Sequence, residues 1–203
     1  MAPELYGSDL STTTPVVALV LHELNVPFEY IQVDMLRDEH KHPDFVAKQP
    51  FGCVPYIDDD GFVLYESRAI CRYLCRKYAD RGGRALGFSV EAAAFDPIVR
   101  FMFWERVYKP MRGTQGSEVI FGEAKRILNQ NLDVYDKILE KQKYMAGDTF
   151  TLADLFPIPY ATRLQPQVQC DYLETKPNVA RWYKDITARP SWQANKHGVR
   201  AIA

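Results

Sequence analysis

The sequence is poor in cysteine, in long apolar runs and in net charge. Its 4 cysteines, among 203 residues, show no CxxC spacing, so the pattern excludes a disulfide framework and a cysteine-ligated metal site. No run approaches the roughly 18 apolar residues of a membrane-spanning helix, and the N-terminus lacks the basic and apolar regions of a secretory signal. These absences predict a soluble, cytoplasmic protein with reduced thiols and no membrane partner.

Charge is balanced, with 25 Lys and Arg against 26 Asp and Glu and an isoelectric point near 6.4. Proteins that bind polyanions usually carry a strong basic excess, so nucleic acid is not expected as a partner. The length of the chain is sufficient for one large domain or for two smaller ones, each with its own core.

The first eighty residues alternate strand and helix patterns. Strands are predicted at 4–7, 28–33, 56–57 and 62–64, and helices at 14–24 and 68–78. A βαβ unit followed by ββα builds a four-stranded mixed sheet with helices packed on it, which is the arrangement of thioredoxin-like domains.

Beyond residue 80 nearly every segment has the helical period. Helices are predicted at 91–108, 117–143, 152–163, 171–174 and 177–189, and Thr151 with Asp154 forms a capping-box pattern. The sequence therefore predicts a thioredoxin-like domain over 1–80, a linker over 81–88 and an all-α domain over 89–203.

A proline at the entrance of the third strand gives the first indication of a binding site. In the run Phe51 to Ile57, the backbone carbonyl and amide of Val54 precede Pro55 and point away from the sheet, so they need a partner. A bound peptide is one such partner. The next helix begins at Glu66 and Ser67, where its unpaired N–H groups and the serine hydroxyl together suit a small carboxylate.

A run of hydroxyl residues precedes the first helix, between Gly7 and Pro15. An ordinary helix cap explains any one of these hydroxyls. The loop also follows the carboxyl end of a strand, where α/β sheets bind ligands, so a hydroxyl here is placed to donate a hydrogen bond to a bound thiolate.

Two further groups of residues, histidine with lysine and the cysteines, have side chains of the types that bind anions or react with thiols. His40 and Lys41 supply donors for a second carboxylate, although a solvated charged loop is the simpler interpretation, and no third ligand near His42 supports a metal. Cys71 and Cys75 are spaced as core residues of a helix. Cys53 differs, because it directly precedes Val54 and would meet a bound thiol.

Together these stretches resemble a cytosolic glutathione transferase, most closely of the phi class. The matching segments are 11–13, 39–41, 49–55, 65–70, 146–148 and 151–154. The resemblance implies a thioredoxin-like domain followed by an all-α domain, a cis bond between Val54 and Pro55, and a homodimer. It also implies detoxifying conjugation of glutathione, as co-substrate and without a cofactor or metal, to hydrophobic electrophiles.

The resemblance also assigns roles. Ser11 would stabilise the glutathione thiolate, and the Val54 backbone would pair with the cysteinyl unit. The glycyl end would be held by His40 and Lys41. The remaining binding residues would be Cys53, Glu66 and Ser67, the last two for the γ-glutamyl end. Relatives usually carry Gln at the position of Cys53, and a thiol is a poor hydrogen-bonding partner, so this end of glutathione should be held less firmly.

The electrophile pocket is expected to include Leu10, Tyr108 and Met111, the last two from an aromatic segment that ordinary core packing also explains. Phe51 is a bulky aromatic on a loop, which predicts a dimer contact, with packing inside its own chain as the alternative. Three other functions remain open: a non-catalytic carrier of glutathione conjugates or hydrophobic metabolites, a glutathione-dependent peroxidase, and an interaction module of the same fold.

Overall fold

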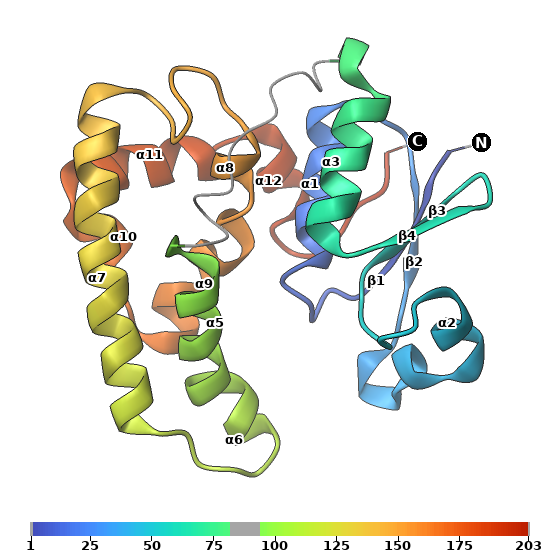
Figure 1. Cartoon of the computed structure of the whole chain (residues 1–203), viewed down its shortest axis with the longest axis horizontal. Helices are drawn as coiled ribbons and strands as arrows, with labels where there is room; N and C mark the ends of the chain where they lie inside the picture. The colour runs from blue at the N-terminus through green and yellow to red at the C-terminus, as the bar shows by residue number, and fades with distance from the viewer. Residues whose placement is uncertain (1, 82–93, 203) are drawn as a thin grey trace. The chain divides into compact units, whose positions relative to one another are not determined.

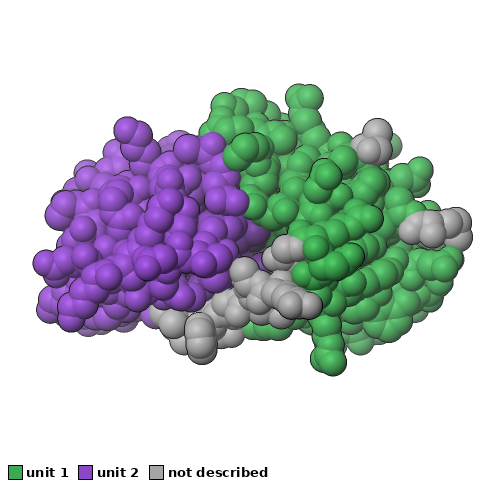
Figure 2. Space-filling model, turned by 90° about the horizontal axis from the view of Figure 1, so that it is seen from above, with its two compact units in different colours: residues 1–86, 190–203 green, residues 87–189 purple. Residues whose placement is uncertain are grey.

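The computed structural model describes residues 2–81 and 94–202. The chain divides into two compact units, Met1–Leu86 with Pro190–Ala203 as unit 1 and Gly87–Arg189 as unit 2 (Figure 2). The last residues of the chain therefore pack with unit 1, whereas the predicted division assigns them to the helical domain. All of the predicted linker except residue 81 lies outside the described residues.

Unit 1 contains one four-stranded sheet with the strand order β2-β1-β3-β4 (Figure 1). Its strands are β1 (Glu4–Gly7), β2 (Glu29–Gln32), β3 (Tyr56–Asp59) and β4 (Phe62–Tyr65). The pair β1 and β2 is parallel, and β3 runs antiparallel to both β1 and β4. This mixed sheet confirms the predicted thioredoxin-like fold.

The pairing register explains which side chains form the core of unit 1. Leu5 lies opposite Ile57 and both are fully buried, while the next pair, Tyr6 and Tyr56, stacks with ring centroids 4.4 Å apart. Successive residues of a strand point to opposite faces, so the aliphatic and the aromatic pairs lie on different faces of the sheet. Phe45 contacts Tyr56 at a centroid distance of 5.1 Å on the aromatic face.

The helices of unit 1 include two that the sequence predicts and two that it misses. The predicted helices α1 (Thr14–Glu23) and α3 (Ser67–Lys77) lie side by side (Figure 1). The missed helices are α2 (Pro43–Lys48) and α12 (Pro190–Asn195), of six residues each. A segment of fewer than two turns does not show the helical period clearly, which is why both were missed.

Cysteines 71 and 75 belong to the buried face of α3. The Cys71 thiol donates a weak hydrogen bond to the Val16 carbonyl at 3.9 Å, and burial raises its pKa. Burial also raises the pKa of Cys75 to about 11. Since the thiolate is the reactive form, these two cysteines are packing residues, as the sequence predicts.

Unit 2 is built from helices. Among the described residues of this unit, the elements are α5 (Asp96–Phe103), a π-helical turn η4 (Trp104–Tyr108), α6 (Lys109–Met111), α7 (Glu118–Lys141), α8 (Leu152–Leu155), α9 (Ile158–Val168), α10 (Tyr172–Thr175) and α11 (Pro177–Thr187). The helix predicted over 152–163 is interrupted, because α8 ends before the next helix begins. Within the predicted helix 91–108, residues 91–93 lie outside the described part of the chain.

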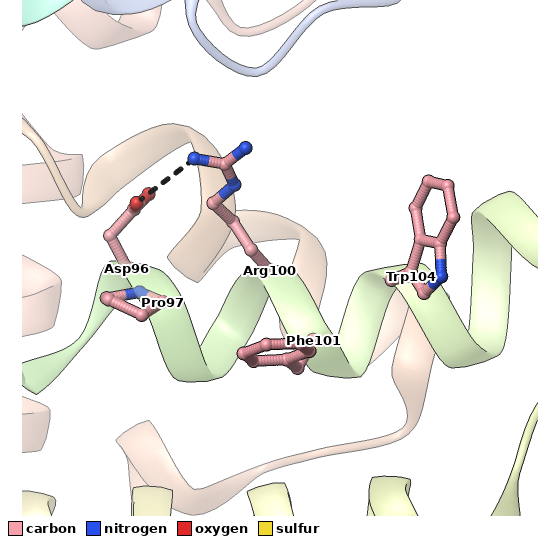
Figure 3. Close-up of a pocket in the computed structure, with 5 residues that line it drawn as sticks. All are labelled: Asp96, Pro97, Arg100, Phe101 and Trp104. Atoms are coloured by element: carbon pink, nitrogen blue, oxygen red, sulfur yellow. Dashed lines mark ion pairs between the residues drawn. The ribbon is translucent and has the colours of Figure 1, made fainter.

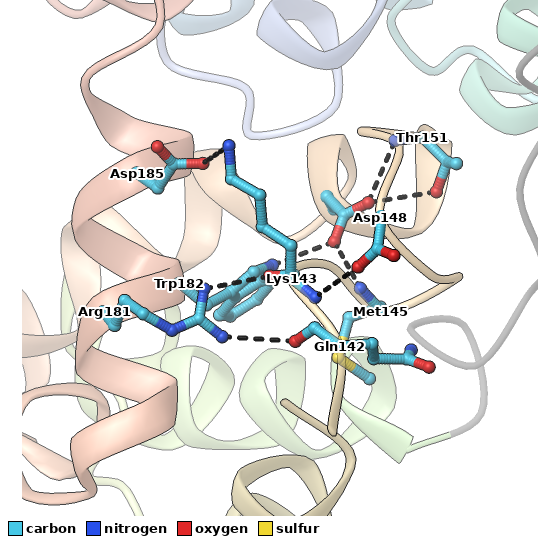
Figure 4. A network of polar contacts seen from close by, with 9 residues as sticks. Gln142, Lys143, Met145, Asp148, Thr151, Arg181, Trp182 and Asp185 are labelled. Atoms are coloured by element: carbon cyan, nitrogen blue, oxygen red, sulfur yellow. Dashed lines mark hydrogen bonds and ion pairs between the residues drawn. The ribbon is translucent and has the colours of Figure 1, made fainter. Parts of the chain in front are cut away.

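A buried carboxylate organises the core of unit 2. Asp154 is fully buried, and it accepts hydrogen bonds from the Thr151 backbone and hydroxyl, from the Met145 amide and from the Trp182 indole at 2.8–3.0 Å. The three donor residues Thr151, Met145 and Trp182 are labelled in Figure 4. The Thr151 hydroxyl in turn accepts from the Ala153 amide, so the predicted capping box is present. None of the helices in the described residues is long and apolar enough to cross a membrane.

Candidate functional site

Three connecting segments meet at one end of the sheet: the one after β1, the one from β2 to β3 and the one after β4. Gly7 of β1 pairs with Gln32 of the parallel strand β2, so the segments that follow both strands leave at the same end. Tyr56 pairs with Tyr6 and with Tyr65 in antiparallel ladders. The chain therefore enters β3 and leaves β4 at that same end. The predicted site residues of unit 1 come from these three segments, at the edge where α/β sheets bind ligands.

Ser11 lies at the start of α1 and its hydroxyl oxygen contacts the first turn of the helix. Ser11 Oγ accepts hydrogen bonds from the backbone amides of Thr13 at 3.0 Å and Thr14 at 3.2 Å. A third contact joins Ser11 Oγ to Thr13 Oγ1 at 2.9 Å. The oxygen thus accepts from the N-cap residue and from the first residue of α1, while its single hydrogen is left for donation.

Thr13 links this loop to the strand entrance. Its hydroxyl donates to the Val54 carbonyl at 3.2 Å, so in its contact with Ser11 it acts as acceptor. The Val54–Pro55 bond is cis, as the resemblance implied. The sequence predicted that the Val54 carbonyl needs a partner outside the sheet, and the Thr13 hydroxyl supplies one within the protein. The Val54 amide has no hydrogen-bond acceptor within the described residues.

Ser8 is the other serine of this loop, and its surroundings differ. It is 1% exposed, and its hydroxyl oxygen is buried without a hydrogen-bond partner among the described residues. Its amide donates to Thr14 Oγ1 at 3.2 Å. Ser8 Oγ therefore takes no part in the hydrogen-bond network of the described residues that joins Ser11, Thr13 and Val54.

His40 and Lys41 are held against the segment that carries Cys53. Lys41 Nζ donates to the Gly52 carbonyl at 2.6 Å, which leaves two of its three N–H groups for an anion. Gly52 has a φ of +57°, and a Cβ there would lie 2.9 Å from the His40 carbonyl oxygen, so only glycine suits this position. His40 Nδ1 is buried and has no partner among the described residues.

Glu66 and Ser67 form the turn into α3. Glu66 has a φ of +70° and its side chain makes no capping bond, although it stands at the N-cap of the helix. A non-glycine residue in this region of φ/ψ space costs about 1–3 kcal/mol, and such residues cluster at binding sites. Ser67 is buried at the first position of the helix, beside the positive end of the helix dipole.

Cys53 and Phe51 lie on the surface of the same loop. Cys53 is a free, exposed thiol, with its sulfur 3.5 Å from the Phe51 carbonyl oxygen. The Phe51 ring is 66% exposed, and its ring contact is with Tyr65 at a centroid distance of 5.9 Å. Apart from this contact, most of the Phe51 ring is open to a partner.

The residues predicted for the electrophile pocket belong to different units. Leu10 is 52% exposed on unit 1. Tyr108, at the end of the π-helical turn, is half-buried, and Met111 is 69% exposed on unit 2.

The sequence analysis missed both the π-helical turn and the role of Thr13 as a link between the loop before α1 and Val54. A hydroxyl at each of positions 11 to 14 was the available signal for the second of these.

A thioredoxin-like sheet with a hydroxyl loop, a cis-proline and a helix N-terminus at one end, followed by an all-helical unit, is typical of a class of glutathione-using enzymes. Two family models match the chain: "Glutathione S-transferase, N-terminal domain" over residues 5–82 and "Glutathione S-transferase, C-terminal domain" over residues 91–190. The chain belongs to the glutathione S-transferase family and is a glutathione transferase.

Named relatives agree with this assignment. The chain is 36% identical to glutathione S-transferase F6 of Arabidopsis thaliana over 94% of its own length and 97% of that protein, and 37% identical to glutathione S-transferase hmp2 of Hypomyces subiculosus over 95% and 96%. Its structure matches glutathione transferase F2 of Populus trichocarpa with a TM-score of 0.88, at 34% identity over 94% and 95% of the two chains.

Membership of the family confirms the broader predictions. Enzymes of this family use glutathione as co-substrate without a cofactor, take a hydrophobic second substrate and work as dimers. Within the described ranges, no group of three or more His, Cys, Asp or Glu side chains is placed to hold a metal ion.

Proposed function

We propose that this enzyme conjugates glutathione to hydrophobic electrophiles, with the Ser11 hydroxyl stabilising the thiolate. The observation that supports this most strongly is that Ser11 Oγ accepts hydrogen bonds from two backbone amides, those of the N-cap residue Thr13 and of Thr14, the first residue of α1. Donors that bond to a hydroxyl oxygen polarise its O–H group and strengthen it as a donor. The positive end of α1 adds to the attraction for a negative sulfur.

The energy required is within reach of this arrangement. A free thiol has a pKa near 8.5, and lowering it by about two units takes about 2.7 kcal/mol. A charge-assisted hydrogen bond together with a helix N-terminus supplies that amount. When glutathione binds, the Ser11 hydroxyl rotates so that it donates to the sulfur instead of to Thr13 Oγ1. The hydroxyl keeps its proton throughout. The thiolate then forms the carbon–sulfur bond, and the electrophile's leaving group departs or its accepting atom takes up the negative charge.

Glutathione binding uses the groups that the sheet end brings together. The cysteinyl unit pairs with the Val54 backbone, whose amide is without an acceptor in the described structure. The glycyl carboxylate is bound by His40 and Lys41, and the γ-glutamyl end by Glu66 and Ser67. The exposed thiol of Cys53 replaces a better hydrogen-bonding group and weakens binding.

Leu10, Tyr108 and Met111 are the residues that we propose for contact with the electrophile. Exposed apolar side chains are costly on a monomeric surface unless a ligand or partner covers them, and Leu10 and Met111 are each more than half exposed. These residues supply apolar area and no charge, which suits a hydrophobic second substrate.

Phe51 is proposed as the dimer contact, with a cavity on unit 2 of a second copy as its receptor. That cavity has a volume of about 430 Å³ and an almost wholly apolar lining. Its lining residues are Pro97, Ile98, Phe101, Val119, Ile120, Glu123, Ala124 and Ile127. An exposed aromatic ring and an apolar cavity of this size are complementary, and burial of the ring would contribute about 2 kcal/mol to association.

Retention on immobilised glutathione, followed by assays with an aryl halide, an isothiocyanate and a hydroperoxide, tests the function. Retention with turnover of the first two substrates supports conjugation. Binding without any turnover would show a carrier, and turnover of the hydroperoxide alone would show a peroxidase. We also propose that the enzyme acts in the cytoplasm, which fractionation of cells that express it would test.

A further inference from the structure

The cavity along helix α5 of unit 2 belongs to the surface proposed above for the dimer contact. Its volume is about 390 Å³, and it is lined by Asp96, Pro97, Arg100, Phe101 and Trp104 (Figure 3). Pro97 and Phe101 also line the cavity that is proposed to receive Phe51. A role that neither proposal includes lies instead in unit 1, where the end of the chain reaches the loop that carries Ser11.

Residues 196–202, which follow α12, form a strap that is bound to unit 1 along its length. Near its end, the Phe28 amide donates to the Ile202 carbonyl at 3.1 Å, just before β2. The strap is also bound to α1, since His22 Nε2 lies 2.7 Å from the Arg200 carbonyl, which can only accept. The Arg200 amide donates to the Asn195 side chain at 2.9 Å and so joins the strap to α12. The strap is therefore a fixed part of unit 1.

Asp9 ties this strap to the loop before α1. Its Oδ1 accepts from the Val199 amide at 2.9 Å and from the Tyr30 hydroxyl at 3.2 Å. The Tyr30 hydrogen is shared with Gln32 Oε1, which lies 2.7 Å away, so the bond from Val199 is the firmer of the two. The strap packs directly on the carboxylate, because a Cβ on Gly198 would lie 3.0 Å from Asp9 Oδ2.

The loop that Asp9 holds is the turn that leads into Ser11. The Ser11 amide donates to the Ser8 carbonyl at 3.0 Å, which closes a β-turn with Asp9 and Leu10 as its central residues. Through Asp9, this turn is bound to a residue 190 positions away in the sequence. A hydrogen bond weakens steeply when its angle falls below about 120°. A displaced turn would therefore weaken the bond from the Ser11 hydroxyl to a thiolate.

We propose that Asp9 is a positioning residue, which anchors the Ser11 turn to the C-terminal strap and so keeps the serine hydroxyl directed at the glutathione sulfur. The inference rests on the proposed role of Ser11 and adds to it a residue that does not touch the substrate. The charge of Asp9 cannot be the source of the effect, because a carboxylate near a thiolate disfavours the thiolate and raises the thiol pKa. Asp9 assists the reaction through the geometry that it imposes.

Two substitutions of Asp9 separate geometry from charge. The measured quantity is the pKa of the glutathione thiol in complex with the enzyme, from the ultraviolet absorbance of the thiolate. Asp9→Ala removes the acceptor for Val199 and should raise this pKa by about one unit and lower kcat/KM for an aryl halide about tenfold at neutral pH. Asp9→Asn keeps an oxygen for the Val199 amide and removes only the charge, so the thiol pKa should not rise.

A matched control separates positioning from a general loss of stability. The Ser191 hydroxyl of α12 donates to Glu23 at the end of α1, and this bond does not involve the loop. Ser191→Ala and Asp9→Ala should both lower Tm, but only Asp9→Ala should raise the thiol pKa. In the Ser11→Ala background, Asp9→Ala should add no further rise, because no hydroxyl is left to position.

Val199→Pro breaks the same bond from the strap side, since proline has no amide hydrogen. It should raise the thiol pKa as Asp9→Ala does, and it provides the test if Asp9→Ala does not fold. A rise in Ser11→Ala with none in Asp9→Ala or Val199→Pro would overturn the role of Asp9 alone. A fall of the thiol pKa in both Asp9 variants would also overturn it, because charge would then dominate. No rise in Ser11→Ala would overturn the proposed function on which the inference rests.

Discussion

Thr13 and Val54, 41 residues apart in the sequence, are joined by a hydrogen bond of 3.2 Å from the threonine hydroxyl to the backbone carbonyl. The bond ties the loop before α1 to the segment before β3. Because the Thr13 hydrogen is committed to Val54, the hydrogen of Ser11 has Thr13 Oγ1 as its acceptor until a ligand arrives. A bound thiolate replaces a neutral acceptor by a charged one, which strengthens the bond.

Replacement of Ser11 by alanine should lower kcat/KM for an aryl halide about 100-fold at neutral pH. The loss corresponds to about two pKa units of the bound thiol, and the rise of the pH–rate profile should move upward toward pH 8.5. The affinity for glutathione should change little. Ser8→Ala is the matched control, since that hydroxyl is buried and has no partner in the described structure. An unaltered rate constant in Ser11→Ala would refute the role of this serine.

Thr13→Val should reduce the conjugation rate less than Ser11→Ala, by about threefold to tenfold. Valine keeps the shape of the side chain but removes both the donor to Val54 and the acceptor for Ser11, each a bond of about 1 kcal/mol. A double-mutant cycle measures the coupling. The two substitutions should be strongly non-additive in ln(kcat/KM), because both act on one hydrogen-bonded network. Additive effects would mean that Thr13 acts independently of Ser11.

The succession of strands and helices in the first half of the chain, and the helices of the second half, could be predicted from the periodicity of apolar residues. The loops of the site could be predicted from the positions of a proline, a helix start and a run of hydroxyl residues. The link between Thr13 and Val54 could not be predicted in this way, because the choice among adjacent hydroxyls depends on backbone geometry at the end of the sheet. Helices α2 and α12 are too short for a periodic signal. The packing of residues 190–203 with unit 1 depends on long-range contacts, such as the Val199 amide with Asp9 at 2.9 Å.

Cys53→Gln should lower KM for glutathione about fivefold, because an amide restores a donor and an acceptor where a thiol offers only weak ones. The position is exposed, so the longer side chain is accommodated without repacking. Isothermal titration calorimetry with glutathione measures the effect directly. Cys53→Ser serves as the control for removal of the sulfur alone. If the Cys53→Gln and Cys53→Ser variants bind glutathione equally tightly, the glutamine amide makes no contact with glutathione.

Phe51→Ser should shift the enzyme from dimer toward monomer, which light scattering coupled to size-exclusion chromatography measures. Ile120→Asp, in the proposed receptor cavity, should do the same, since a buried unpaired carboxylate is strongly unfavourable. Phe62→Ser is the control, because this ring is 49% exposed on the hairpin and rests against Tyr73 of its own unit. A dimer that survives both of the first two substitutions places the interface elsewhere.

The buried carboxylate of Glu105 should make unit 2 sensitive to acid. Its hydrogen bonds from Lys109 Nζ at 2.7 and 2.8 Å and from the Ser117 amide at 2.6 Å lower its pKa. A carboxylate with a lowered pKa in the folded state contributes stability above its unfolded pKa, near 4.3, and that contribution is lost as the pH falls through the folded value. The Tm of Glu105→Gln should therefore lie furthest below that of the wild type at pH 7, and this difference should become smaller below about pH 4.

A matched control separates this effect from general acid unfolding. The bidentate hydrogen bond from Arg126 also lowers the pKa of Glu123, but that carboxylate is 54% exposed and its pair is screened by water. Glu123→Gln should thus follow the wild-type Tm at every pH. Glu105 differs because it is 3% exposed and holds the loop at Ser117, where Gly116 packs so closely on the Glu105 carbonyl that no side chain is tolerated. A pH-independent difference between wild type and Glu105→Gln would show that packing, and not the charge of this carboxylate, stabilises the loop.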